Sequence, residues 1–211
     1  SIGVLGLGSL EYYSCMRTNL SDVEFFVSRS GYTGADGFEI VCDTGDTVLL
    51  WEQILKAGAQ PCGLGARDTL RTEMGYCLYG HELSNQLTPF ESGIGWTVHL
   101  GKESDFVGKD NLVARKASGD FRRLRGLKVL EKGIPRPEQR VVNEKDGREI
   151  GRVSSGTFSP SLKRGIALAF LEKEFGKKGT VVDIDIRGKM CKGEVVSLPF
   201  VPSKVKRKKT R

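Results

Sequence analysis

The chain has 211 residues, 38% of them hydrophobic and 28% charged, and its formal net charge is +7. This length fits one large domain or two small ones, and the composition is that of an ordinary folded protein, which excludes a largely disordered chain. Because no apolar run approaches the ~18 residues that a membrane-spanning helix needs, we expect no membrane association.

The positive charge is concentrated at the C-terminal end. Without the six cations of this end, 27 Lys and Arg stand against 26 Asp and Glu. We therefore predict a disordered basic tail over residues 203–211, not a basic groove across a fold. Binding of nucleic acid through the tail is not expected, although it stays open as an alternative that a tail deletion would test. The six cations are Lys204, Lys206, Arg207, Lys208, Lys209 and Arg211.

The five cysteines are scattered and include no Cys-x-x-Cys pair. Their number and spacing favour reduced structural thiols over a disulfide framework or a zinc site. We therefore expect no metal.

Residues 28–40, SRSGYTGADGFEI, predict a glycine-rich turn that leads into a strand. Gly34 and Gly37 allow positive φ, and Asp36-Gly37 is a hairpin signal. In the strand, Phe38 points to one face and Glu39 to the other.

Glu39 then needs a partner, since an unpaired buried carboxylate costs several kcal/mol. One reading is a salt bridge with Arg29, Arg67 or Arg71. The other is a ligand with two parallel N–H donors, such as the 2-amino-4-oxo ring of a pterin or guanine, beside a wall formed by Tyr32.

Three helices are predicted, over residues 46–58, 65–75 and 108–119, each ended by a glycine. We expect the first to cover the Phe38 face. The buried side chains expected in the first and third helices are Leu50, Trp51, Ile54, Leu55, Leu112, Val113 and Ala117.

Arg67 stands in the first turn of the second predicted helix, where a cation opposes the helix dipole. Gly63 and Gly65 precede it, so bare N–H groups could also meet an anion there. The position indicates either an external carboxylate or an internal ion pair with Asp36 or Glu73.

After residue 119 the pattern changes to short runs rich in β-branched residues. Strands are predicted over 124–130, 149–155, 165–171 and 180–188, with a hairpin turn at 145–147. We therefore predict an α+β part up to residue 119 and an all-β part over 120–202.

Six blocks together resemble the aminomethyltransferase (T-protein) of the glycine cleavage system, in the order and spacing of that family. They are SRSGYTGADGFEI, PCGLGARDTLRTEMGYCLYGHEL, TPFESGIGW, DFVGKDNL, SSGTFSPSLKRGIALAF and VVSLPFV. The resemblance implies an α+β fold in which residues 1–119 are the end of a folate-binding domain, without its N-terminal part. Residues 120–202 would form an antiparallel β-barrel or jelly-roll-like domain.

The resemblance also implies which residues of this chain contact the folate. Tyr32 and Glu39 match positions that line the pterin pocket, Arg67 matches a folate-contacting arginine, and Tyr76 matches an aromatic contact found in some members. Ala35 stands where the family usually has Glu, a departure at a turn from which we expect little consequence. The family's catalytic aspartate lies well before GYTG, so we expect no catalytic residue in this chain and no activity of the chain alone.

The implied reaction moves a methylene group from an aminomethylated lipoyl carrier (H) protein to tetrahydrofolate, with release of ammonia. The resemblance implies a location in the mitochondrial matrix in a eukaryote or in the cytoplasm in a bacterium.

Because the sequence opens at Ser1, we interpret it as a fragment, a gene-model artefact or half of a split protein. Two alternatives stay open: the C-terminal part of a dimethylglycine or sarcosine dehydrogenase, and a non-catalytic folate-binding scaffold.

Overall fold

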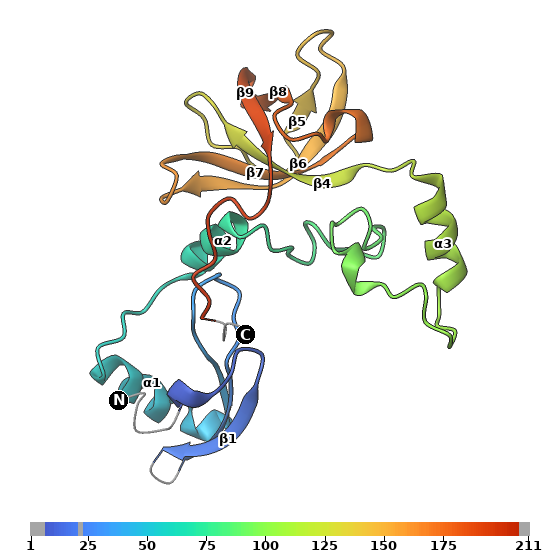
Figure 1. Cartoon of the computed structure of the whole chain (residues 1–211). Coiled ribbons are helices and arrows are strands. Elements are labelled where there is room, and N and C mark those ends of the chain that lie inside the picture. The colour runs from blue at the N-terminus through green and yellow to red at the C-terminus, as the bar shows by residue number, and fades with distance from the viewer. Residues whose placement is uncertain (1–6, 21–22, 207–211) are drawn as a thin grey trace. The chain divides into compact units, whose positions relative to one another are not determined.

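The computed structural model describes residues 7–20 and 23–206 and divides the chain into two units, each described here by itself (Figure 1). The first unit combines Ser1–Leu70 with Ser203–Arg211, and the second is Arg71–Pro202. Helices and an antiparallel sheet in the first unit and a closed β-barrel in the second confirm the predicted α+β fold class.

The first unit contains a three-stranded antiparallel sheet in the order β1-β2-β3, formed by β1 (Cys15–Leu20), β2 (Val23–Ser28) and β3 (Glu39–Cys42). Burial alternates along β2, as expected of a strand with one face against a core. Val23, Phe25 and Val27 form that core with Leu7, and Phe38 packs against it. Phe38 therefore faces the core of this sheet, whereas its cover by the first predicted helix stays a prediction.

The predicted tight hairpin at Asp36-Gly37 is wrong. Ser28 of β2 pairs directly with Glu39 of β3, so residues 29–38 form a long loop between the two strands. Within this loop Gly34 has a positive φ of 71°, a conformation that favours glycine. The Asp36 side chain binds Arg29.

Helix α1 (Thr47–Lys56) matches the first predicted helix, but its buried face is narrower than expected. Leu50 is buried, whereas Trp51 is 52% exposed. Helical spacing predicts which side chains share a face, but it does not say how much of that face a neighbouring element covers. Helix α2 (Leu64–Glu73) is followed by Gly75 at φ 70°, as predicted.

The second unit is built around a closed antiparallel barrel in the strand order β4-β7-β6-β5-β8-β9 (Figure 1). Thirteen buried residues form its core, among them Leu127, Ile150 and Ile184. The sequence predicted four of the strands, and it missed β5, which has three residues, and β9. The strands are β4 (Arg123–Val129), β5 (Arg140–Val142), β6 (Glu149–Ser159), β7 (Arg164–Leu171), β8 (Val181–Ile186) and β9 (Lys189–Val196).

Strands β6 and β7 approach closely at Gly151. A Cβ atom on this residue would lie 2.2 Å from the carbonyl oxygen of Phe170, closer than real Cβ contacts allow. A glycine in the middle of a strand often marks such a close backbone approach. Gly151 is therefore required by the barrel geometry and not by a turn.

Helix α3 (Lys109–Ser118) lies between Gly108 and Gly119, which both have positive φ, in agreement with the predicted limits. None of its residues is buried. Leu112 is half-buried and Val113 is 45% exposed, so the predicted inward face is wrong.

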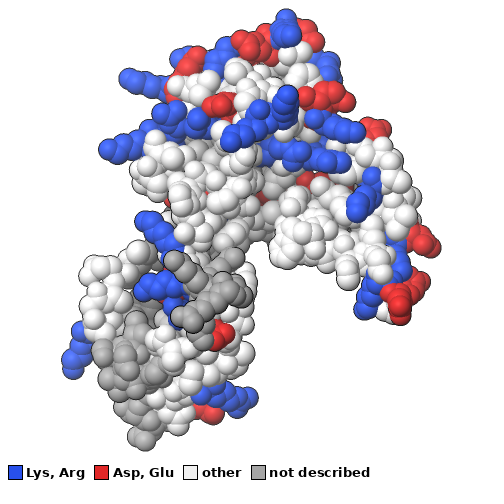
Figure 2. Space-filling model, viewed as in Figure 1, with Lys and Arg blue, Asp and Glu red and all other residues white. Residues whose placement is uncertain are grey.

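The charge distribution differs from the prediction of a basic tail on a neutral body. Residues 122–202 contain 18 Lys and Arg against 10 Asp and Glu, and the acidic excess of residues 1–121 hides this in the total. Figure 2 shows many Lys and Arg side chains over the β-barrel, with Asp and Glu between them. The barrel is therefore a basic domain in its own right.

The start of the predicted disordered tail has a defined structure. The Lys204 N–H donates to the Gly34 carbonyl at 2.8 Å, and Lys204 forms a parallel bridge with Ala35. The Ser203 hydroxyl also donates to the Gly34 carbonyl, at 3.4 Å. The prediction of disorder is thus wrong for 203–206, and 207–211 lie outside the described residues.

Candidate functional site

A bidentate ion pair closes the loop of residues 29–38. Arg29 donates from Nε to Asp36 Oδ1 at 3.1 Å and from Nη2 to Asp36 Oδ2 at 2.8 Å, and its Nη1 donates to the Leu10 carbonyl at 2.6 Å. The hydrogen bonds from Arg29 lower the pKa of the Asp36 carboxyl. Such fork-shaped pairing fixes orientation as well as distance, so the loop has a defined shape before any ligand binds.

Tyr32 and Arg67, two of the predicted site residues, lie together in the first unit. The Arg67 guanidinium carbon lies 4.9 Å from the centroid of the Tyr32 ring, within the range of a cation–π contact. Tyr32 is half-buried, whereas Arg67 is exposed. The structure therefore presents a cationic group stacked on an aromatic wall.

The two carboxylates that were considered as ion-pair partners of Arg67 bind other groups. Asp36 is bound by Arg29. Glu73, in the second unit, accepts from the hydroxyls of Ser159 and Ser161 at 2.5 Å and 3.0 Å. Both carboxylates that the sequence suggested for Arg67 are therefore held by other side chains.

Glu39 is exposed, so the expectation of a buried carboxylate is wrong. Its Oε2 accepts a hydrogen bond from the Ser30 hydroxyl at 2.5 Å. The salt bridges proposed from sequence are not the ones that form, because Arg29 pairs with Asp36 and Arg71 pairs with Glu82. The strand pattern indicated the direction of Glu39 correctly, but it could not show that this sheet face is open.

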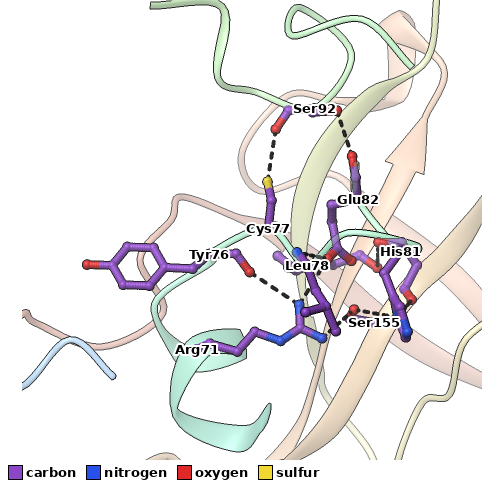
Figure 3. Close-up of polar contacts among 10 residues, drawn as sticks. Arg71, Tyr76, Cys77, Leu78, His81, Glu82, Ser92 and Ser155 are labelled. Atoms are coloured by element: carbon purple, nitrogen blue, oxygen red, sulfur yellow. Dashed lines mark hydrogen bonds and ion pairs between the residues drawn. The ribbon is translucent and has the colours of Figure 1, made fainter. Parts of the chain in front are cut away.

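Tyr76 belongs to the second unit, while Tyr32, Glu39 and Arg67 belong to the first. Its side chain is half-buried, and its carbonyl oxygen accepts from Arg71 Nη1 at 3.2 Å. Figure 3 shows the Tyr76 ring pointing away from the polar network that its carbonyl joins. The backbone of Tyr76 is thus tied to the buried side chain of Arg71.

A buried polar network in the second unit was not predicted (Figure 3). Arg71 Nη1 lies 2.9 Å from Glu82 Oε2, and the two side chains are 2% and 0% exposed. Arg71 Nη2 donates to the Ser155 hydroxyl at 2.8 Å, and His81 Nδ1 lies 3.2 Å from that hydroxyl. The network joins the end of α2 to strand β6, so its role is structural. No sequence motif marks His81 or its partners.

Cys77 lies beside this network and is not a nucleophile. Its Sγ donates to the Ser92 carbonyl at 3.4 Å, and burial raises the pKa of the thiol to about 11. At neutral pH the group is therefore a protonated thiol, and the thiolate is the reactive form of cysteine. This agrees with the predicted structural role of the cysteines.

Within residues 7–20 and 23–206, no three or more His, Cys, Asp or Glu side chains are grouped in a way that could hold a metal ion. No helix in the same part of the chain has both the length and the apolar character needed to cross a membrane.

Two family models match this chain. The GCVT N-terminal domain matches residues 4–102, and the glycine cleavage T-protein C-terminal barrel domain matches residues 122–202. The second match covers the closed barrel described above, so the fold defines the class as a T-protein-like chain with a C-terminal barrel.

Relatives with assigned names agree with this class. The chain is 47% identical over 199 residues to the aminomethyltransferase of Geobacillus sp. (strain WCH70), covering 92% of this chain and 54% of the relative. It is 46% identical over 186 residues to the aminomethyltransferase of Bacillus subtilis (strain 168), covering 86% and 51%. The chain therefore spans about half the length of these relatives.

A solved structure agrees as well. The crystal structure of the glycine cleavage system aminomethyltransferase T from Bartonella henselae matches 97% of this chain and 57% of its own, with a TM-score of 0.87 and 31% identity. The chain belongs to the aminomethyltransferase family of glycine cleavage T-proteins, as the sequence blocks predicted.

Proposed function

We propose that this chain forms part of a tetrahydrofolate-dependent aminomethyltransferase of the glycine cleavage system. In the proposed reaction, the carbon–sulfur bond of an aminomethyl group on the lipoyl arm of a carrier protein breaks. The carbon–nitrogen bond breaks as well, and the carbon becomes the methylene group of methylenetetrahydrofolate by bonding to two folate nitrogens. The two protons that these nitrogens lose go, in the net balance, to the sulfur, which leaves as a thiol, and to the amine, which leaves as ammonia. Family membership and the geometry of the first unit support this proposal.

The observation that carries the proposal is the Arg67 guanidinium stacked on Tyr32 in the same unit as an exposed carboxylate. A folate combines a flat ring carrying N–H donors with an anionic tail. We assign Glu39 to the donors of the pterin ring, Tyr32 and Tyr76 to its faces, and Arg67 to an anionic group of the folate. Much of the rate of such a transfer can come from positioning the folate nitrogen against the carbon.

The domain limits, the position of the catalytic aspartate, the carrier partner and the location are also proposals. We place the catalytic aspartate outside this chain, so that residues 1–119 are part of a folate-binding domain and 120–202 the barrel domain. The lipoylated H protein is the proposed carrier partner. The relatives named above are bacterial, which favours the cytoplasm over the mitochondrial matrix.

Glu39→Gln is expected to weaken tetrahydrofolate binding by about 1.5–3 kcal/mol, because a charged acceptor of two hydrogen bonds becomes a neutral one. The measurement is calorimetry on the 211-residue chain supplemented with the part of the Geobacillus relative that it does not cover, here termed the complemented chain. Unchanged affinity would remove Glu39 from the site. Absence of binding by the unmodified complemented chain would reject the proposed function.

Arg67→Ala is expected to raise the tetrahydrofolate dissociation constant by roughly tenfold or more, since a charged hydrogen bond is worth about 1.5–3 kcal/mol. The exposed position of Arg67 predicts little change in thermal stability. Titration and thermal melting of the same complemented variant separate the two effects. A lower melting temperature with unchanged affinity would mean that the stack on Tyr32 is structural only.

A further inference from the structure

We infer that Ser30 is a positioning residue for the Glu39 carboxylate and that Ser28 orients Ser30. The inference rests on the proposed function, in which Glu39 accepts N–H donors from the pterin. It adds two hydroxyl groups that set the direction in which this carboxylate receives them.

The three side chains form a continuous hydrogen-bonded chain. Ser28 and Glu39 are directly opposite each other in the β2–β3 ladder, at the point where the loop of residues 29–38 begins and ends. The hydroxyls of Ser28 and Ser30 lie 3.0 Å apart, and Ser30 donates to Glu39 Oε2 at 2.5 Å. Ser30 thus connects a serine on one strand to the glutamate on the next.

The direction of this chain follows from proton counting. A serine hydroxyl has one proton to donate and can accept through its lone pairs, whereas an ionised carboxylate only accepts. Because the proton of Ser30 goes to Glu39, the contact between the serines must be a donation from Ser28. The hydrogen bond from Ser28 to Ser30 therefore polarises the Ser30 hydroxyl and strengthens its hydrogen bond to Glu39.

Ser30 is itself held by its neighbours. The Arg29 N–H donates to the Ser14 carbonyl at 2.9 Å, and the Tyr13 N–H donates to the Arg29 carbonyl at 2.9 Å. The bidentate pair of Arg29 with Asp36 fixes the same stretch from the side chain. The peptide groups on both sides of Arg29 are therefore held, and the Ser30 hydroxyl approaches Glu39 from a set direction.

The benefit to a ligand is pre-organisation. The terminal torsion of a glutamate is broad, so an exposed carboxylate rotates unless something holds it. The bond from Ser30 uses one acceptor position of Oε2, and a carboxylate has about four such positions over its two oxygens. The plane of Glu39 is therefore set while both oxygens can still accept from parallel N–H donors, which lowers the ordering cost of binding.

The test uses tetrahydrofolate and its 2-desamino-2-methyl analogue, which lacks the exocyclic amino donors, in calorimetric titrations of the complemented chain. Ser30→Ala is expected to weaken tetrahydrofolate binding about 3–10-fold, the worth of one ordinary hydrogen bond. Binding of the analogue should change less than twofold. Ser30→Thr, which keeps the hydroxyl, should restore the affinity for tetrahydrofolate.

A double-mutant cycle separates positioning from damage to the loop. In the Glu39→Gln background, Ser30→Ala should cause no further loss of tetrahydrofolate affinity if Ser30 acts through the Glu39 carboxylate. An equal loss in both backgrounds, or for both ligands, would overturn the inference. So would a drop in melting temperature that Ser30→Thr does not repair. If unmodified complemented chain binds neither ligand, the proposed function fails and this inference fails with it. If the unmodified complemented chain binds tetrahydrofolate but Ser30→Ala does not weaken that binding, the inference about Ser30 fails and the proposed function stands.

Discussion

Replacing Arg71 with alanine is expected to lower the free energy of unfolding of the second unit by about 3–5 kcal/mol. Arg71 and Glu82 are 2% and 0% exposed, so the substitution leaves the Glu82 carboxylate buried without its counter-charge. It also removes the donor to Ser155 on strand β6. Urea denaturation followed by circular dichroism gives the change in free energy.

Arg140→Ala is the matched control in the same unit. Arg140 forms an ion pair with Asp185 at 3.0 Å, but its side chain is 51% exposed, so the expected loss is less than about 1 kcal/mol. A double substitution, Arg71→Met with Glu82→Leu, should recover much of the stability because both buried charges disappear together. Equal effects of Arg71→Ala and Arg140→Ala would contradict the buried network.

The 211-residue chain alone is expected to form no detectable methylenetetrahydrofolate, whereas the complemented chain is expected to turn over. The proposed catalytic aspartate lies outside the chain, and loss of a positioned acid or base typically costs ~10²–10⁴ in rate. The chain spans about half the length of its relatives, and the proposal places the rest of the folate pocket in the part that it does not cover. The assay uses an aminomethylated lipoyl carrier protein and tetrahydrofolate.

The control for this assay is the complemented chain carrying Glu39→Gln, which should turn over more slowly at low tetrahydrofolate concentration. A rate for the chain alone that matches the complemented chain would overturn both the fragment interpretation and the assignment of the aspartate. Equal inactivity of both samples, despite folded spectra, would argue for the non-catalytic scaffold.

The elements with the strongest local patterns could be predicted from the sequence. The glycines at 75 and 119 end their helices at the expected places, and the alternation of apolar and polar residues in β8 is that of a half-buried strand. The direction of Phe38 also follows from strand geometry. Strand β5 was missed because three residues are too few for a periodic signal.

Burial and partner choice could not be predicted. Trp51 and Val113 sit at positions with the right spacing, yet both are exposed, because spacing does not report what covers a face. The sequence offered Arg29, Arg67 and Arg71 as partners for Glu39. The structure gives that role to a serine, since partner choice depends on which segments the fold brings together.

The pairing of Gly34 with residues 203 and 204 has a consequence for the order of folding during synthesis. Ser203 and Gly34 are 169 residues apart, and the whole barrel is made between them. A ribosome releases the N-terminal residues first, and domains generally fold as they emerge. The loop that carries Tyr32 must therefore wait, with its Gly34 carbonyl hydrated, until the barrel has left the exit tunnel. Closing so long a separation is entropically slow, so this strand bridge is among the last contacts that the new chain makes.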